Sequence, residues 1–124
     1  MADFNGTIAS MQKVVHPIID LIAHPPVLKD LDFEAAGPAL TAGEILALDA
    51  NDYAVSYDPD SLGPEVNIVG VLAEDVDPSG EISDINGKVL WHGAVKASAL
   101  TVGGDPATAT DIASLEAAGR IFTV

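Results

Sequence analysis

Short apolar runs rich in β-branched residues, each bounded by turn-forming residues, dominate the chain between residues 43 and 101. Two of these runs lie in residues 67–77 and 88–101, with the turn-forming segments Pro78-Ser79-Gly80 and Asn86-Gly87 between them. β-branched side chains suit a pleated, half-buried surface, whereas Pro, Gly and Asn suit tight turns. The pattern predicts strands, with Asn86-Gly87 as the strongest turn signal because both residues tolerate positive φ.

A hairpin is predicted just before these runs. Residues 43–49 and 53–58 have the composition of two short strands, and Ala50-Asn51-Asp52 between them provides the turn. Farther along, Gly93 interrupts an apolar run at a place where a strand is expected to bend or bulge.

The C-terminal part of the chain changes to a helical pattern. Asp105-Pro106 predicts an N-cap followed by proline at the first helical position. Residues 107–118 are Ala-rich, and Gly119 suits the left-handed residue that ends many helices. We therefore expect one short helix, followed by a terminal strand over residues 120–124.

Residues 1–40 differ from the rest of the chain. Their apolar residues recur partly at the i, i+3, i+4 spacing of a helix, but Pro17 interrupts this pattern. The sequence His24-Pro25-Pro26 stops any helix, because a residue before proline is driven towards extended backbone. We interpret residues 1–40 as an N-terminal arm and residues 41–124 as a β-rich body.

Composition and charge exclude several classes of protein. The 124 residues are 48% hydrophobic and 19% charged, which suits one folded domain with a moderate core. A formal net charge of −14 disfavours nucleic acids and anionic membranes as partners, because both carry phosphate groups. The absence of cysteine excludes disulfides and thiolate chemistry. The sequence has no secretory signal pattern and no apolar run long enough to span a bilayer, so we expect no export by the general secretory route.

Histidines and carboxylates offer few candidates for catalysis or metal binding. His16, Asp20 and His24 have the i, i+4, i+8 spacing that places three metal ligands on one helical face, but prolines interrupt that helix. The acidic residues between Glu74 and Asp84 lack the spacing of a calcium-binding loop. No nucleophile, base and orienting group can be ordered into a catalytic set. We therefore predict no enzymatic activity, no cofactor and no metal site.

Several segments of residues 40–124 resemble, in the same order, the lambda-type bacteriophage head decoration proteins. These segments are residues 43–49, 57–59, 68–76, 89–95 and 115–122. Members of that family fold as a bent β-ribbon with an incomplete barrel, called a β-clip, plus short helical pieces. Together with the pattern above, the resemblance implies a mainly β fold with a short C-terminal helix and an N-terminal arm.

The resemblance also implies a function. Family members form trimers on the outer surface of the mature capsid, cement adjacent subunits of the major capsid protein, and are not enzymes. We therefore expect a homotrimeric virion protein that is made in the host cytoplasm and binds the outside of a capsid.

Two sets of residues are candidates for these contacts. The apolar residues of the arm are candidates for capsid binding, namely Phe4, Ile8, Met11, Val14, Val15, Ile18 and Ile22. Trp91, His92 and Val95 are candidates for the trimer interface. We interpret His92, beside Trp91, as a strand residue at an edge or a subunit contact rather than as a general base.

Two other functions remain open. A carbohydrate-binding or adhesion module would need Trp91, Tyr53 and Tyr57 to form an exposed aromatic platform. A metal-dependent enzyme would need the two histidines and the aspartate of the arm to bind a metal ion.

Overall fold

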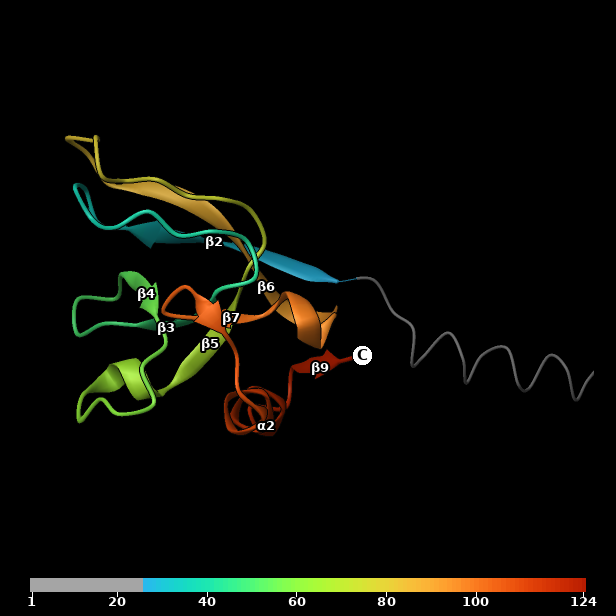
Figure 1. The fold of residues 1–124 in the computed structure, drawn as a ribbon. Helices are drawn as coiled ribbons and strands as arrows, with labels where there is room; N and C mark the ends of the chain where they lie inside the picture. The colour runs from blue at the N-terminus through green and yellow to red at the C-terminus, as the bar shows by residue number, and fades with distance from the viewer. Residues whose placement is uncertain (1–25) are drawn as a thin grey trace, which may run out of the picture.

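Strand β6 (Ile85–Val95) organises the sheet, because it pairs with three other strands. The computed structural model of the chain describes residues 26–124. β2 (Val27–Phe33) and β5 (Ile68–Leu72) flank β6 in antiparallel orientation, whereas β9 (Ile121–Thr123) runs parallel to its C-terminal end. Figure 1 shows β2 and β6 as a long ribbon beside the shorter strands.

The remaining strands and helices complete the body. β3 (Ile45–Leu48) and β4 (Ala54–Ser56) extend the sheet in the order β2-β6-β5-β3-β4. The other elements are η1 (Pro64–Val66), η2 (Ala97–Ala99), β7 (Thr101–Val102), β8 (Asp105–Pro106) and α2 (Ala109–Ala117). The expected mainly β fold with a short C-terminal helix is confirmed, since α2 is the only α-helix within residues 26–124.

The central strands are buried on both faces. Neighbouring residues in β3, Ile45 and Leu46, belong to two different apolar clusters, and the same holds for Val71 and Leu72 in β5. One cluster includes residues of α2 and β9, and the other includes residues of β2. Because successive side chains of a strand point to opposite faces, burial on both faces explains why these strands are continuous apolar runs.

The body begins at β2, so part of the segment assigned to the arm belongs to the sheet. Residues 27–33 pair with β6 from Val27 opposite His92 to Phe33 opposite Ile85. Phe33 is buried, and Leu40 forms a bridge with Val76. The sequence conceals this strand because most of its residues are exposed, which leaves few apolar positions to mark the alternation.

The turn predicted at Asn86-Gly87 is wrong, because both residues lie inside β6. Gly87 is opposite Leu31 of β2. A Cβ atom on Gly87 would lie 2.7 Å from side-chain atoms of both Phe33 and Val76. The glycine therefore serves close packing rather than a change in chain direction.

The hairpin predicted over residues 43–58 is confirmed, and the irregularity predicted at Gly93 lies two residues earlier in β6. β3 and β4 pair antiparallel, and Asp52 in their connection has a φ of 66°. Between β2 and β6 the register shifts, because Val27 is opposite His92 while Leu28 is opposite Leu90. This shift leaves Trp91 as the extra residue of a bulge, two residues before Gly93, whose φ is +152°.

The C-terminal helix begins later than predicted. Asp105-Pro106 forms strand β8, and Thr108 is the N-cap. The Thr108 hydroxyl accepts a hydrogen bond from the Asp111 amide, and the Asp111 carboxylate accepts one from the Thr108 amide. This reciprocal capping box satisfies two amides that the helix leaves unpaired. The expected left-handed Gly119, with a φ of +85°, and the terminal strand are confirmed.

The place at which the chain is truncated should decide whether the body folds. Deleting residues 2–24 should leave the sheet intact, because that deletion removes no residue of β2. Deleting residues 2–35 removes β2 and the buried Phe33, and loss of a core aromatic alone costs about 3–5 kcal/mol. We expect a cooperative thermal transition by circular dichroism from the shorter deletion and none from the longer one. A cooperative transition after the longer deletion would show that β2 is dispensable.

Candidate functional site

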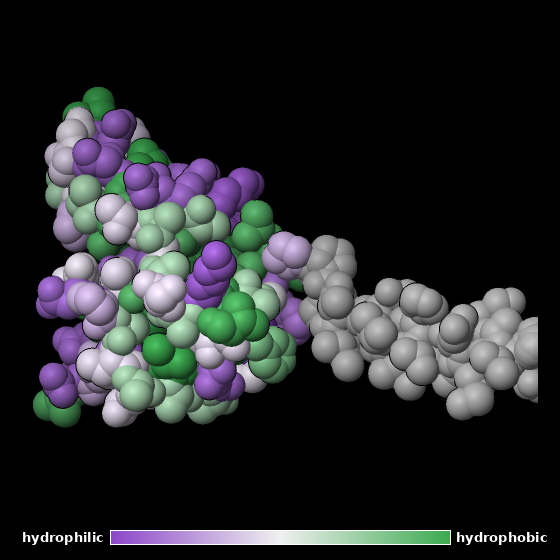
Figure 2. All heavy atoms as spheres, turned by 45° about the vertical axis from the view of Figure 1, so that its right-hand side comes forward, coloured by the Kyte–Doolittle hydropathy of each residue, from purple (hydrophilic) through white to green (hydrophobic). Residues whose placement is uncertain are grey.

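Exposed apolar side chains gather around the C-terminal end of β6. Of the seven large apolar residues that are exposed within residues 26–124, four lie here, namely Val27, Leu28, Phe122 and Val124. Phe122 is 54% exposed and Val124 is 81% exposed. Figure 2 shows hydrophobic residues, in green, beside the point where the described chain begins. We call these four residues, together with His92 and Val95, the β6–β9 surface.

Trp91 lies beside this surface under two cationic side chains. Lys29 Nζ is 4.1 Å from the centre of the indole ring, and Arg120 Cζ is 4.5 Å from it. Arg120 also donates hydrogen bonds to the carbonyl oxygens of Trp91, at 3.3 Å, and of Val69, at 3.0 Å. One guanidinium group therefore connects the bulge in β6, the start of β9 and strand β5.

The other two candidates for the trimer interface belong to the surface itself. The His92 ring makes an edge-to-face contact with Phe122, with ring centres 6.3 Å apart. The carbonyl of Val95 accepts a hydrogen bond from the Val124 amide at 2.9 Å. The structure thus brings Trp91, His92 and Val95 together with residues of β2 and β9 that sequence reasoning did not select.

Basic charge is concentrated in the same region. Residues 26–124 contain four basic side chains, and three of them, Lys29, Lys96 and Arg120, lie on or next to the β6–β9 surface. The chain as a whole carries 19 acidic residues. Glu116 adds one acidic group to this region, since its carboxylate accepts hydrogen bonds from the amide and hydroxyl of Thr123 in β9. Three basic side chains gathered on so acidic a protein favour a binding partner that presents carboxylates to this surface.

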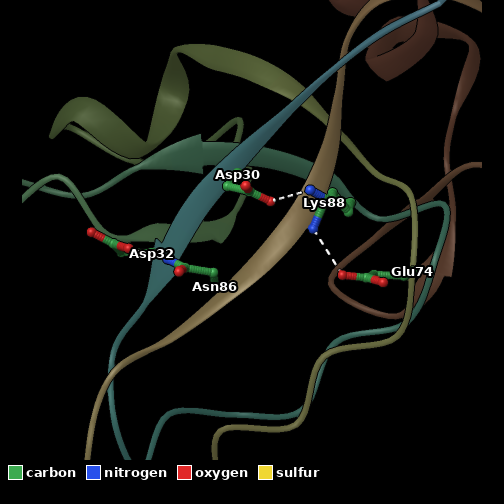
Figure 3. Close-up of polar contacts among 5 residues, drawn as sticks. All are labelled: Asp30, Asp32, Glu74, Asn86 and Lys88. Carbon is green, nitrogen blue, oxygen red and sulfur yellow. Dashed lines mark hydrogen bonds and ion pairs between the residues drawn. The ribbon is translucent and has the colours of Figure 1, made fainter.

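The outer side of the β2–β6 ribbon is polar instead (Figure 3). Lys88 Nζ lies 2.8 Å from Asp30 Oδ1, and the Lys88 amide donates to Glu74 Oε2 at 3.0 Å. Asn86 donates to Asp32 across the same pair of strands. The hydrogen bond with Asp30 raises the pKa of Lys88. This side therefore suits contact with water.

A buried carboxylate, Glu44, holds the β7–β8 turn against the sheet. Its side-chain oxygens accept hydrogen bonds from the hydroxyls of Ser56 and Thr101, the latter at 2.7 Å, and from the amides of Gly103 and Gly104, at 2.6 and 3.2 Å. Glu44 is only 1% exposed. A carboxylate accepts several donors in this way, so the site is satisfied and has no spare group for chemistry.

A second carboxylate fastens the loop before β6. Asp84 accepts hydrogen bonds from the Tyr53 hydroxyl, at 2.7 Å, and from the Ala35 amide, at 2.9 Å. These bonds lower the pKa of Asp84, and the bond with Asp84 raises the pKa of Tyr53 to about 12. The residues before β6 are thereby linked to the segment after β2 and to the β3–β4 hairpin.

The arm residues selected from the sequence lie outside the described residues. This applies to the candidates for capsid binding, Phe4, Ile8, Met11, Val14, Val15, Ile18 and Ile22, and to His16, Asp20 and His24. Within residues 26–124, no group of three or more His, Asp or Glu side chains is arranged to hold a metal ion.

Removing the Glu44 carboxylate should destabilise the body. Glu44→Ala removes the acceptor of the Gly104 amide and of the Ser56 and Thr101 hydroxyls, and it leaves the Gly103 amide only Ser56 Oγ, at 3.1 Å. We expect the free energy of unfolding to fall by about 3 kcal/mol. Glu44→Gln keeps one acceptor oxygen and should lose about 1–2 kcal/mol. The exposed Glu81→Ala is the control, with a change within about 0.5 kcal/mol. Urea titration measures all three, and equal stability of Glu44→Ala and Glu81→Ala would contradict this assignment.

The phenol of Tyr53 should titrate near pH 12 only while Asp84 is present. Asp84→Asn removes the negative acceptor, so the pKa of Tyr53 should fall towards its ordinary value of 10.0. Phenolate absorbance followed against pH measures this, and subtraction of the Tyr53→Phe titration isolates the one phenol. An unchanged titration in Asp84→Asn would mean that the hydrogen bond does not control the Tyr53 pKa.

Comparison of the sequence with protein-family profiles and with curated proteins found no match. The likeness to decoration proteins is therefore carried by the segments quoted above and stays a prediction. Within residues 26–124, no helix has the length and hydrophobicity needed to cross a membrane.

Proposed function

We propose that this chain is a structural virion protein that binds the outer surface of a mature phage capsid as a homotrimer. In this role it cements adjacent subunits of the major capsid protein and performs no catalysis. The observation that carries the proposal is the ordered set of segments that resemble the lambda-type head decoration proteins.

The positions of those segments support the proposal. Residues 43–49 contain β3, residues 68–76 contain β5, and residues 89–95 are the C-terminal part of β6. Residues 115–122 contain the end of α2 and the start of β9. The fifth segment, residues 57–59, follows β4 outside any strand or helix but contributes the buried Tyr57. All five segments contribute buried residues, so the resemblance covers the core of the body.

The distribution of charge and apolar groups also suits such a binder. The β6–β9 surface combines exposed apolar residues with nearby Lys29, Lys96 and Arg120, whereas the ribbon around Asp30 and Lys88 is polar. A trimer presents three copies of one binding surface, so engagement of one copy makes the next contact intramolecular and modest contacts add up to high avidity. The acidic remainder keeps a densely covered particle soluble.

The apolar arm extends the contact beyond the body to a capsid subunit or a neighbouring protomer. Its residues Phe4, Ile8, Met11, Val14, Val15, Ile18 and Ile22 need cover from water, since buried apolar area is worth about 25 cal/mol per Å². A capsid subunit or a neighbouring protomer supplies that cover. An arm of this kind can also add a strand to an exposed edge of a capsid sheet.

No observation favours a carbohydrate-binding module. Tyr57 is buried at 5% exposure, Lys29 and Arg120 lie over Trp91, and Tyr53 is hydrogen-bonded to Asp84. The three aromatic rings therefore do not form the flat exposed platform that such a function requires. The metal-dependent alternative depends on arm residues and gains no support from residues 26–124.

Removing the distal arm should abolish decoration while leaving the body folded. We expect the full chain to sediment with expanded heads of a lambda-type phage that lack their own decoration protein. Deleting residues 2–16 should weaken this binding by about 100-fold or more, because every copy of a multivalent contact is lost together. Ile82→Ser, which replaces a fully exposed apolar residue outside the β6–β9 surface, is the control and should bind normally.

Two results would contradict the proposal. The full chain could fail to bind heads from every lambda-type phage in a panel. Alternatively, the deletion variant could bind as tightly as the full chain, which would remove the arm from the account.

A further inference from the structure

An apolar groove runs beside the first described residue. Its volume is about 420 Å³, and it lies between β2, the end of β6 and η2. Leu28, Val95 and Leu100 line it together with smaller residues, and Pro26 forms part of its rim. Figure 1 shows the start of β2 and the end of β6 meeting here. The groove adjoins the β6–β9 surface, with which it shares Leu28 and Val95.

The charge in the groove is as informative as its shape. Among residues 26–124, Lys96 is the only charged residue that lines it. Lys96 is exposed and forms no ion pair with any residue of the described range 26–124. An occupant that matches the groove therefore presents several aliphatic side chains and one carboxylate.

The chain contains one such segment a few residues before the groove. Residues 18–22 read Ile-Ile-Asp-Leu-Ile, which is four aliphatic side chains around a single acidic one, Asp20. We propose that the groove of one protomer binds residues 18–22 of a second copy of this chain, with Asp20 next to Lys96. The partner of this surface is thus the arm of a neighbouring protomer.

Pro25 and Pro26 favour a second copy over the same chain. Ile22 is four residues before Pro26, so a connecting segment of this length spans at most about 14 Å. To fold back into its own groove, the chain must reverse direction within residues 23–25. Pro25 and Pro26 oppose such a reversal, because each drives the residue before it towards extended backbone.

Exchange of this kind has a consequence for assembly. Each arm leaves one protomer and enters the groove of the next, which is a head-to-tail contact, and such contacts close into a ring when the rotation allows. The exchange of arms does not depend on the proposed function, whereas the expected number of three copies does. Residues 18–22 then hold the protomers together, and the residues from Phe4 to Val15 are left to reach the capsid.

Cross-linking between isotopically distinct chains tests the exchange directly, without any capsid. The chain has no cysteine, so Ser98→Cys in η2, an exposed residue beside the groove, gives a single attachment point for a benzophenone maleimide. Chains that carry Ser98→Cys and the benzophenone are produced with ¹⁵N. They are mixed with wild-type ¹⁴N chains and irradiated. We expect mass spectrometry to find cross-links from the heavy body to residues 18–22 of light chains. Ala113→Cys, on the exposed side of α2, is the matched control and should give none.

A charge exchange tests the contact between Lys96 and Asp20. Lys96→Glu and Asp20→Lys should each raise the dissociation constant for self-association, measured by sedimentation, by about two- to fivefold. The chain that carries both substitutions should return to the wild-type value, because the pair is restored with its signs reversed. Lys88→Glu, which removes a lysine already paired with Asp30, is the control and should leave self-association unchanged.

Three results would overturn the exchange. The first is a set of cross-links that join residues 18–22 only to the body of their own chain. The second is a protein that sediments as a monomer at every concentration. The third is a double charge variant that associates more weakly than either single variant. A protein that decorates capsids without exchanged cross-links refutes this inference and leaves the proposed function standing. Exchanged cross-links in a protein that binds no capsid support this inference and refute the proposed function.

Discussion

The carboxylate of Glu44 is the interaction on which the body most depends. A buried charge is costly unless hydrogen bonds compensate it, and here two hydroxyls and two glycine amides do so. The backbone supports the same junction, because the Thr101 amide donates to the carbonyl of Gly43 at 3.0 Å. Only glycine fits at position 43, where φ is +99° and a Cβ atom would lie 2.2 Å from the Ala99 carbonyl oxygen. The Gly43-Glu44 pair thus connects the start of β3 to the β7–β8 turn.

That junction determines where the C-terminal part of the chain lies. The β7–β8 hairpin leads into α2, whose Leu115 packs in the same cluster as Ile45 of β3. α2 then directs β9 alongside the end of β6, and Arg120 bonds to the carbonyls of Trp91 and Val69. The β6–β9 surface is therefore assembled from segments far apart in the sequence. Weakening Glu44 should loosen this surface as well as the core.

The sequence was informative where local chemistry decides the structure. Residue types alone predicted the β3–β4 hairpin, the left-handed Gly119 and the terminal strand, and they placed the bulge of β6 within two residues of Trp91. The sequence-based prediction failed where tertiary packing decides. Gly87 was expected in a turn but lies inside a strand, where Phe33 and Val76 approach it closely. Nothing local marks Glu44 as the acceptor for Gly103, or Lys29 and Arg120 as neighbours of Trp91. Those contacts depend on strand order, which periodicity does not encode.

We propose that an acidic β body carries an apolar arm that binds a capsid in several copies. Cryo-electron microscopy of expanded and unexpanded phage heads incubated with the full chain tests it most directly. We expect added trimeric density on the outer surface at three-fold and quasi-three-fold positions of expanded heads, with the polar side of the β2–β6 ribbon facing solvent. Expanded heads without added density, or density elsewhere on the shell, would contradict it.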